Sequence, residues 1–264
     1  LRAGLVAALV ALSLMLLAGA GVLVRSLDYL PGSVLGVNPE GVISFGVRGR
    51  RLGLSDARLT SVIRDTMARL GQAPGGQGAA FSAPAAFFND GWIPVRVRPA
   101  GAEAPDARVE SSVVSGSYFE VLGIPMRAGR TFTDAEFSLE PRASSRVAIL
   151  SEPLARSLFG DTPPVGRLID VGSGFTGAWE FDRTLEIVGV AGATRSGLRF
   201  RDGPRVALYE AARPRLAWST VYAKSTLPDP AAIAAARETV RALEPNLPLV
   251  NAGTLAGGIE RLIP

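Results

Sequence analysis

The sequence has no cysteine and no histidine among its 264 residues. Without cysteine there is no disulfide, no thiolate nucleophile and no zinc–thiolate site. Without histidine the chain lacks the commonest general base and the commonest transition-metal ligand, which excludes Ser-His-Asp and Cys-His catalysis. We predict no catalytic, cofactor-binding or metal-binding residues in this chain.

Lysine is also scarce, because Lys224 is the only lysine among 28 basic residues. The 24 acidic residues are interspersed with the basic ones and the formal net charge is +4, so we expect a surface of mixed charge. A nucleic-acid-binding protein would concentrate its basic residues in a stripe, so no nucleic-acid partner is predicted. The densest basic stretch, residues 194–205, fits a solvated loop, which we favour, or a contact with phosphates or an acidic partner.

Apolar residues are abundant, at 47% of the chain, and residues 3–24 form an uncharged run between Arg2 and Arg25. As a helix this run would extend about 33 Å, which is enough to cross a bilayer. A cleaved signal peptide is the main alternative, but the run is longer than its apolar region and no A-x-A site follows. A buried soluble helix is less favoured because the run has no polar face. The sequence predicts a transmembrane helix within residues 1–27.

After this run, the pattern follows a strand, helix, strand order. Residues 42–47 indicate a strand, and Ser55 is placed to cap a helix that we expect to end at Gly71. Residues 71–78, GQAPGGQG, lack the GK[ST] of a phosphate-binding loop and are expected to form a flexible connector. A weaker strand is predicted at residues 79–83.

The same order recurs near the other end of the chain. Residues 220–223 indicate a strand, Asp229 is expected to cap a helix with Pro230 at its first position, and a short strand follows at residues 249–251. Two such units, separated by a long stretch, predict one α+β domain that is split by an insertion.

The inserted part is expected to be mostly β. One helix is predicted to start after its cap at Ser151 and to end at Gly160. Residues 172–177, GSGFTG, match the dinucleotide fingerprint, but we expect a hairpin strand after them and not the helix that would hold a pyrophosphate, so nucleotide binding is not predicted. Alternating patterns predict short strands at residues 109–114, 147–150, 168–171, 185–190 and 205–209.

Residues 115–137 are expected to form a structural corner of the inserted part. Ser117 with Glu120, and Thr133 with Glu136, match the capping-box pattern that satisfies backbone donors at a helix start. The residues of the corner expected to be packed are Tyr118, Phe119 and Leu122. Its conspicuous residues, all expected to be structural, are Ser117, Tyr118, Phe119, Glu120, Gly123, Gly129 and Arg130.

Six segments carry a resemblance to a known family and follow that family's order: residues 11–27, 37–47, 113–137, 147–171, 185–199 and 227–255. They include ALSLMLLAGAGVLVRSL and VVSGSYFEVLGIPMRAGRTFTDAEF. Together they resemble the first transmembrane helix and extracytoplasmic domain of FtsX-like ABC transporter permeases, the MacB-type periplasmic core. The amino-acid sequence of these segments is most similar to that of large duplicated orphan permeases.

The resemblance implies a fold and its boundaries. A transmembrane helix (residues 1–27) would precede a β-α-β porter-like subdomain, made of residues 28–108 and 213–264. A mostly-β sabre-like subdomain, residues 109–212, would be inserted between these halves. In this family the soluble domain lies on the periplasmic side of the bacterial inner membrane, and charge does not settle the orientation independently.

The resemblance also implies partners and a role, and it implies that the protein is not an enzyme. The partners would be a cytoplasmic ATP-binding subunit, the remaining permease helices or a second permease half, and the lipid bilayer. Arg25, Ser26 and Leu27 would couple membrane and domain. The family's permeases return to the membrane after a segment like residues 254–264, so we expect either a fragment of a longer permease or an unusual truncated protein.

Two functions remain open at this point. The first is a non-catalytic periplasmic domain that transmits conformational change from the ATPase across the membrane, for export or extraction of an unknown substrate. The alternative is a membrane-anchored ligand-binding or sensor domain that captures a peptide or a lipid between its subdomains. Hydrolase activity is a remote third possibility.

Overall fold

The computed structural model describes residues 12–13, 15, 36–84, 93–102, 107–139, 144–173, 180–195, 206–212 and 219–261. The chain divides into two units, Leu1–Leu35 and Gly36–Pro264. In the first unit Leu12, Ser13 and Met15 are helical. The rest of the predicted membrane helix lies outside the described residues, as do Arg25, Ser26 and Leu27. None of the helices that the structure describes combines the length and the apolar character needed to cross a bilayer.

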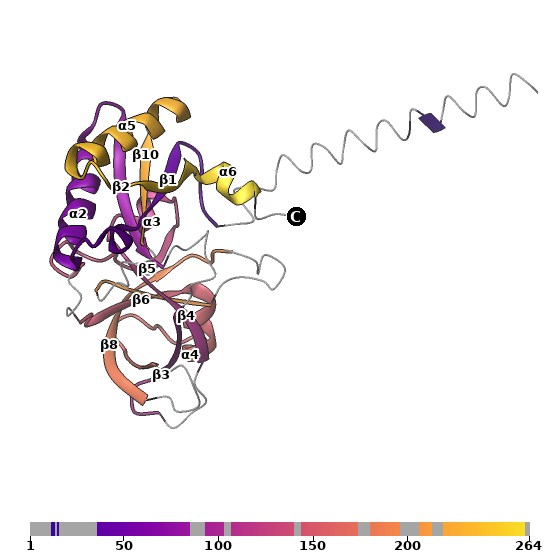
Figure 1. The fold of residues 1–264 in the computed structure, drawn as a ribbon. Coiled ribbons are helices and arrows are strands. Elements are labelled where there is room, and N and C mark those ends of the chain that lie inside the picture. Colours follow the sequence, from indigo (N-terminus) through magenta and orange to yellow (C-terminus); the bar gives the residue numbers. More distant parts are fainter. Residues whose placement is uncertain are drawn as a thin grey trace, which may run out of the picture. The chain divides into compact units, whose positions relative to one another are not determined.

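The second unit contains an 11-stranded sheet and several helices (Figure 1). Its strands are β1 (Val42–Val47), β2 (Gly76–Ala83), β3 (Ile93–Pro99), β4 (Ala107–Val114), β5 (Met126–Gly129), β6 (Val147–Ser151), β7 (Leu168–Ser173), β8 (Glu180–Ala191), β9 (Ala207–Glu210), β10 (Ser219–Ser225) and β11 (Leu249–Thr254). Its helices are the 3-10 helix η1 (Gly49–Leu52) and the α-helices α2 (Asp56–Gln72), α3 (Tyr118–Val121), α4 (Glu152–Phe159), α5 (Asp229–Leu243) and α6 (Leu255–Glu260).

Four strands and two helices enclose the first core. Strands β11, β1, β10 and β2 lie side by side in that order, and each neighbouring pair is antiparallel. Helices α2 and α5 pack together on one face of these strands (Figure 1). Alternate residues of each strand point toward the helices, as the two-residue period of a strand requires. The buried residues of this core are Ile43, Phe45, Val47, Leu59, Val62, Ile63, Leu70, Ala79, Phe81, Ala83, Leu139, Val221, Ala223, Ala232, Ala236, Val240 and Leu247.

Six further strands close into a barrel around the second core. Their order is β4, β3, β7, β8, β6 and β9, and the parallel pairing of β9 with β4 completes the ring. Helix α4 follows β6 directly and contacts β3, β4, β6, β8 and β9, so it covers one end of the barrel. The buried residues of this core are Val95, Val97, Val109, Ala148, Leu150, Leu154, Ala155, Ile169, Val171, Leu185, Ile187, Val190 and Leu208.

A polar cluster lies inside the barrel, at the end opposite to α4. Arg183 of β8 is paired in register with Val171, a residue of the barrel core, and it forms an ion pair with Glu210 of β9. Ser111 of β4 donates a hydrogen bond to Glu210 Oε1 at 2.7 Å. Glu210 pairs with Ala148 near the start of β6, whereas α4 begins where β6 ends. The cluster therefore links three strands across the mouth of the barrel.

The first strand, helix, strand unit forms with two differences from the prediction. Ser55 caps α2 as predicted, since its Oγ accepts from the Arg58 amide at 3.2 Å. Helix α2 continues past Gly71 and ends at Gln72. The prediction of a flexible connector at residues 71–78 is wrong, because the last three of these residues belong to β2 and pair with β10. Tertiary pairing overrides the weak strand propensity of glycine there.

The second strand, helix, strand pattern and the hairpin also form, with one difference from the prediction. Asp229 is the first residue of α5 and not its cap, because Pro228 occupies the cap position. Strands β7 and β8 pair as an antiparallel hairpin, as predicted for the sequence around GSGFTG. Strand β3 and helix α6 were not predicted. Strand β3 has a readable signal, since Val95 and Val97 point into the barrel while Arg96 and Arg98 alternate with them.

Candidate functional site

The corner segment, defined here as residues 115–139, connects the barrel to the first core. It leaves β4 at Ser115, contains α3 and β5, and reaches the first core at Leu139. Helix α3 contacts β2 and β10 of the first sheet, whereas β5 pairs with β8 of the barrel. Figure 1 shows α3 and β5 between the two groups of elements. This segment is therefore the part of the chain that is placed to hold the two cores together.

Two serines attach the corner segment to β2. Ser115 Oγ accepts from the Phe81 amide at 3.0 Å, and the Ser115 amide donates to the Phe81 carbonyl at 3.2 Å. Ser117 occupies the cap position of α3 but makes no capping hydrogen bond, because its Oγ donates to the Ala79 carbonyl at 2.7 Å. The predicted capping box of Ser117 and Glu120 is therefore wrong. A longer-range acceptor on β2 takes the hydroxyl, and Glu120 is left exposed.

An aromatic cluster fills the space between the two cores. Tyr118 and Phe119 of α3 are each 1% exposed, and Leu122 is fully buried, as predicted for this helix. The Tyr118 ring lies 5.9 Å from the ring of Tyr222 on β10 and 6.1 Å from that of Tyr209 on β9. Phe119 meets Tyr209 edge to face at 5.2 Å. Edge-to-face pairs of this kind contribute about 0.5–1.5 kcal/mol beyond the area that they bury.

Two predicted glycines are required by backbone geometry. Gly123 has φ +65°, and a Cβ there would lie 2.8 Å from the Cβ of Asn38. Gly129 has φ +69°, and a Cβ there would collide with the Val188 carbonyl oxygen of β8. A side chain at either position is therefore excluded by both conformation and space. Glycine at these positions lets the backbone of the corner segment lie close to the barrel at Gly129 and close to residues 36–41 at Gly123.

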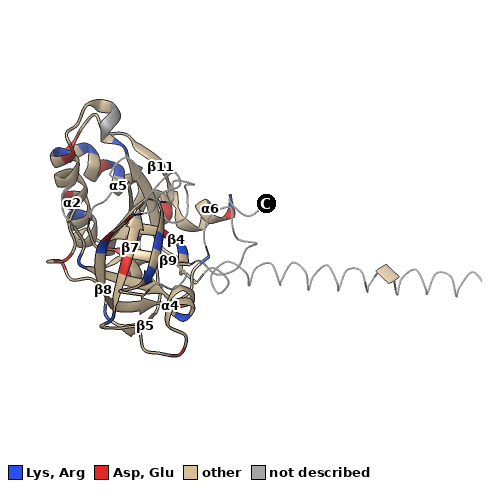
Figure 2. Ribbon diagram, turned by 90° about the horizontal axis from the view of Figure 1, so that it is seen from below, with Lys and Arg blue, Asp and Glu red and all other residues tan. Residues whose placement is uncertain are grey.

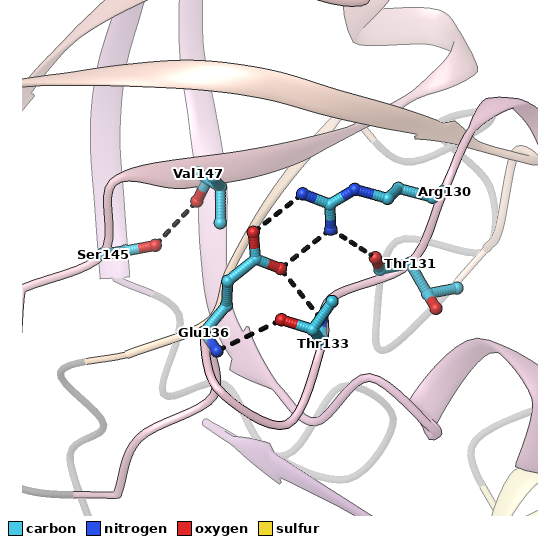
Figure 3. A network of polar contacts seen from close by, with 6 residues as sticks. All are labelled: Arg130, Thr131, Thr133, Glu136, Ser145 and Val147. Atoms are coloured by element: carbon cyan, nitrogen blue, oxygen red, sulfur yellow. Dashed lines mark hydrogen bonds and ion pairs between the residues drawn. The ribbon is translucent and has the colours of Figure 1, made fainter.

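Arg130 and Glu136 close the second turn of the corner segment (Figure 3). Both terminal nitrogens of Arg130 donate to the Glu136 carboxylate at 2.8 Å, which is the bidentate geometry that favours strong pairing. Glu136 also accepts from the Thr133 amide at 2.8 Å, and its own amide donates to Thr133 Oγ1 at 3.3 Å. Both hydrogen bonds of the predicted capping box are present, but they close a turn and not a helix.

This arrangement lowers the pKa of the Glu136 carboxyl to about 2, chiefly through its hydrogen bonds with Arg130 and further through those with Thr133. The pKa of the Arg130 guanidinium is raised for the same reason. The pair is partly exposed, with side-chain accessibilities of 50% and 23%. Its hydrogen bonds with Thr131 and Thr133 fix the geometry of the turn.

The corner segment ends by inserting into the first core. Leu139 is 1% exposed in that core, and its carbonyl accepts from Thr60 Oγ1 of α2 at 3.3 Å. The Phe137 ring lies 6.0 Å from that of Phe81. The Ser138 amide donates to the Ala211 carbonyl just after β9. Phe137 and Leu139 thus pack in the first core, although they lie in the chain between β4 and β6, two strands of the barrel.

The structure gathers most of the predicted corner residues at one junction. Ser117, Tyr118 and Phe119 contact β2, β9 and β10, whereas Glu120 contributes no contact of this kind. The sequence reasoning missed residues whose partners lie far away in the chain. Ser115 is the first residue of the predicted corner but was not singled out, and no local pattern marks the others: Leu139, Arg183, Tyr209, Glu210 and Tyr222.

Basic and acidic residues are interspersed over the helices and strands (Figure 2). No group of three or more possible metal ligands occurs in the described ranges. The junction consists of hydrogen bonds, packed aromatic rings and close backbone contacts.

Residues 3–243 match the sequence pattern of the MacB-like periplasmic core domain. An 88-residue stretch is 33% identical to the uncharacterized ABC transporter permease YknZ of Bacillus subtilis (strain 168). That stretch covers 33% of this chain and 18% of the relative, so the chain matches less than a fifth of the curated relative's length.

The fold is similar to two solved structures. One is the periplasmic region of MacB from Actinobacillus actinomycetemcomitans, with a TM-score of 0.54, 13% identity, and coverage of 86% of this chain and 93% of that one. The other is the extracellular domain of the noncanonic ABC-type transporter YknZ from Gram-positive bacteria, with a TM-score of 0.47, 19% identity, and coverage of 80% and 100%. On the sequence match over most of its length, together with its mixed α/β fold, the chain belongs to the MacB-like periplasmic core domain family.

Proposed function

We propose that this chain is the extracytoplasmic part of an ABC transporter permease, and that it transmits conformational change from a cytoplasmic ATP-binding subunit across the membrane. The observation that supports this most is the family match over residues 3–243, which begins within the apolar run. The transported substrate is not specified by any residue of the junction. The proposed role is mechanical and needs no catalytic group in this domain.

The proposal includes a membrane helix within residues 1–27, with Arg25, Ser26 and Leu27 at its junction with the domain. The uncharged composition of residues 3–24 supports it, as does the helical conformation of Leu12 and Met15, which are 58% and 72% exposed. Apolar side chains that find no protein partner are stabilised by lipid. The lipid bilayer and further permease helices, or a second permease half, are the corresponding partners.

The proposal also assigns a porter-like part to residues 28–108 and 213–264 and a sabre-like part to residues 109–212. Two separate cores support a division into two parts, but they do not follow these boundaries throughout, because Val95 and Val97 of β3 pack in the second core and Leu139 packs in the first. Tyr118 and Phe119 are proposed to hold these parts together, assisted by Ser117, Gly123, Gly129 and Arg130.

The test uses the full-length permease, assembled with its ATP-binding subunit in lipid vesicles. Tyr118→Ala removes the central ring of the junction and is expected to reduce ATP-driven transport at temperatures where circular dichroism shows a folded domain. Glu120→Ala, on the exposed side of the same helix, is the matched control and should retain activity. Equal transport by wild type and a folded Tyr118→Ala variant would contradict the mechanical role.

Membrane placement is tested separately. Leu12→Arg puts a charge near the middle of the apolar run, at a cost of about 2.5–3.5 kcal/mol for insertion. We expect this variant to be extracted from membranes at alkaline pH more readily than Leu12→Ile. Complete extraction of the unmodified chain would exclude the membrane helix.

A further inference from the structure

The first residues of the second unit, residues 36–41, contact three parts of the molecule at once. The Asn38 amide donates to the Leu122 carbonyl of the corner segment at 2.8 Å. The Gly41 carbonyl accepts from the Ser225 amide of β10 at 2.8 Å. Gly36 has φ +68°, and a Cβ there would collide with the Ala193 carbonyl oxygen, two residues beyond β8. These residues therefore touch the first sheet, the corner segment and the barrel.

These contacts are close and specific. Gly36 and Gly123 both adopt a left-handed conformation, and at both a side chain would meet neighbouring atoms across the contact. Val37, between Gly36 and Asn38, is 4% exposed and so is packed inside the unit. If residues 36–41 made only peripheral contacts, the contact would not require glycine at positions 36 and 123, and Val37 would not be buried.

The two cores are also joined to each other at several independent places. Strands β2 and β4 pair through Ser82 with Val114 and Ala83 with Val113. The serine hydrogen bonds to β2, the aromatic cluster and the buried Leu139 add further contacts across the junction. Hinge motion requires a few residues that absorb large backbone changes. A hinge motion in the described part of the junction would break buried hydrogen bonds and separate packed aromatic rings. A hinge is therefore disfavoured there.

We propose that residues 36–41 are the point at which movement is delivered to the domain, to the first core and to the barrel at the same time. The two cores then move as one rigid body and not as two parts that open and close. The delivery of movement rests on the proposed function, whereas the rigidity of the junction does not.

The rigidity of the junction is tested by double electron–electron resonance between spin labels on introduced cysteines. These 264 residues contain no native cysteine that would also be labelled. The exposed pair Ala68→Cys and Asp161→Cys spans the junction, because Ala68 lies on α2 and Asp161 follows α4. Ala68→Cys with Ala234→Cys, both on helices of the first core, is the control pair. We expect a single cross-junction distance distribution that is no wider than the control. A clearly wider or double-peaked distribution would overturn the rigid junction.

The delivery point is tested in the full-length permease with its ATP-binding subunit, in vesicles that contain acceptor-labelled lipids. A donor on Asp161→Cys reports the distance from barrel to membrane. We expect ATP to change this distance while the cross-junction distance stays constant. Gly36→Val should abolish the change. Gly101→Val, at φ +72° with no atom within 4 Å of its Cβ position, should preserve it.

The outcomes separate the two proposals. A cross-junction distance that changes with ATP overturns the rigid body but leaves the proposed function standing. A barrel-to-membrane distance that never responds to ATP contradicts the proposed function, and a narrow cross-junction distribution would still support the rigid junction. An unaltered ATP response in Gly36→Val overturns the assignment of residues 36–41 as the delivery point.

Discussion

At the scale of single residues, backbone geometry determines the path of the corner segment at Gly129. Gly129→Ala is expected to destabilise the fold in two ways, because it forces a side chain into φ +69° and drives a Cβ into the Val188 carbonyl. The conformational part alone costs about 1–2 kcal/mol. Gly101→Ala carries only that part, since φ is +72° and nothing lies within 4 Å. Urea unfolding should therefore rank Gly129→Ala as clearly less stable than Gly101→Ala. Equal losses of stability in the two variants would mean that β8 accommodates the added Cβ without an energetic cost.

The ion pair of Arg130 and Glu136 makes part of the stability depend on pH. The pKa of Glu136 is about 2 in the folded protein, below the value of about 4.3 of an unfolded chain. Its contribution is therefore complete above the unfolded value and is lost as the pH falls toward the folded value. Glu136→Gln removes this contribution, so the stability gap between wild type and variant should shrink between pH about 5 and pH about 2. A gap that is constant over this range, measured by urea unfolding, would show that the pair does not stabilise the turn.

Substitutions at Ser117 and Glu120 test which hydrogen bond stabilises the start of α3. Ser117→Ala removes the hydrogen bond to the Ala79 carbonyl and is expected to cost about 1 kcal/mol. Glu120→Ala changes an exposed residue and should alter the free energy of unfolding by less than about 0.5 kcal/mol. The reverse ranking in thermal or chemical unfolding would restore the capping box that the sequence pattern suggests.

At the scale of elements, residues 137–139 matter because they return to the first core. Leu139→Ala creates a cavity beside α2 and is expected to cost about 2–5 kcal/mol. Leu52→Ala is the control, because Leu52 is 47% exposed and should change stability by less than about 0.5 kcal/mol. If both variants unfold at the same urea concentration as the wild type, the contact of this segment with the first core does not contribute to stability.

Local patterns predicted those elements whose signal lies within their own residues. The cap at Ser55, the strands that alternate and the end of α4 at Gly160 follow from side-chain period and backbone preference. Strand β3 could have been predicted as well, because Val95, Arg96, Val97 and Arg98 alternate.

Other features depend on partners that are distant in sequence. Ser117 fits a capping box locally, but the Ala79 carbonyl competes for its hydroxyl. Gly76 and Gly78 read as a connector, but β10 recruits them into the sheet. The closure of the barrel by β4 and β9, and the ion pair of Arg183 with Glu210 inside it, have no local signal at all. For this reason the members of the corner segment could be named from sequence, whereas most of their contacts could not.

At the scale of the whole molecule, the continuous sheet and the shared junction couple the two cores. The first core contains Leu139, which lies in the chain between β5 and β6, and the aromatic cluster combines Tyr222 of β10 with Tyr209 of β9. Domains joined by small polar interfaces unfold separately, but a buried and hydrogen-bonded junction makes unfolding cooperative.

We therefore predict that destabilising one core destabilises the other equally. Ile63→Ala in α2 should raise hydrogen exchange of the slowest amides of β8 by the same factor as those of α2, because both exchange through global unfolding. Val97→Ala in β3 is the reciprocal experiment and should accelerate the slowest amides of α2 in the same way. Ile63 belongs to the first core and Val97 to the second, and both are 0% exposed, so each substitution creates its cavity in one core only. Faster exchange confined to the substituted core would mean that the junction separates before either core unfolds, and a domain of that kind could not pass movement from one part to the other as a single body.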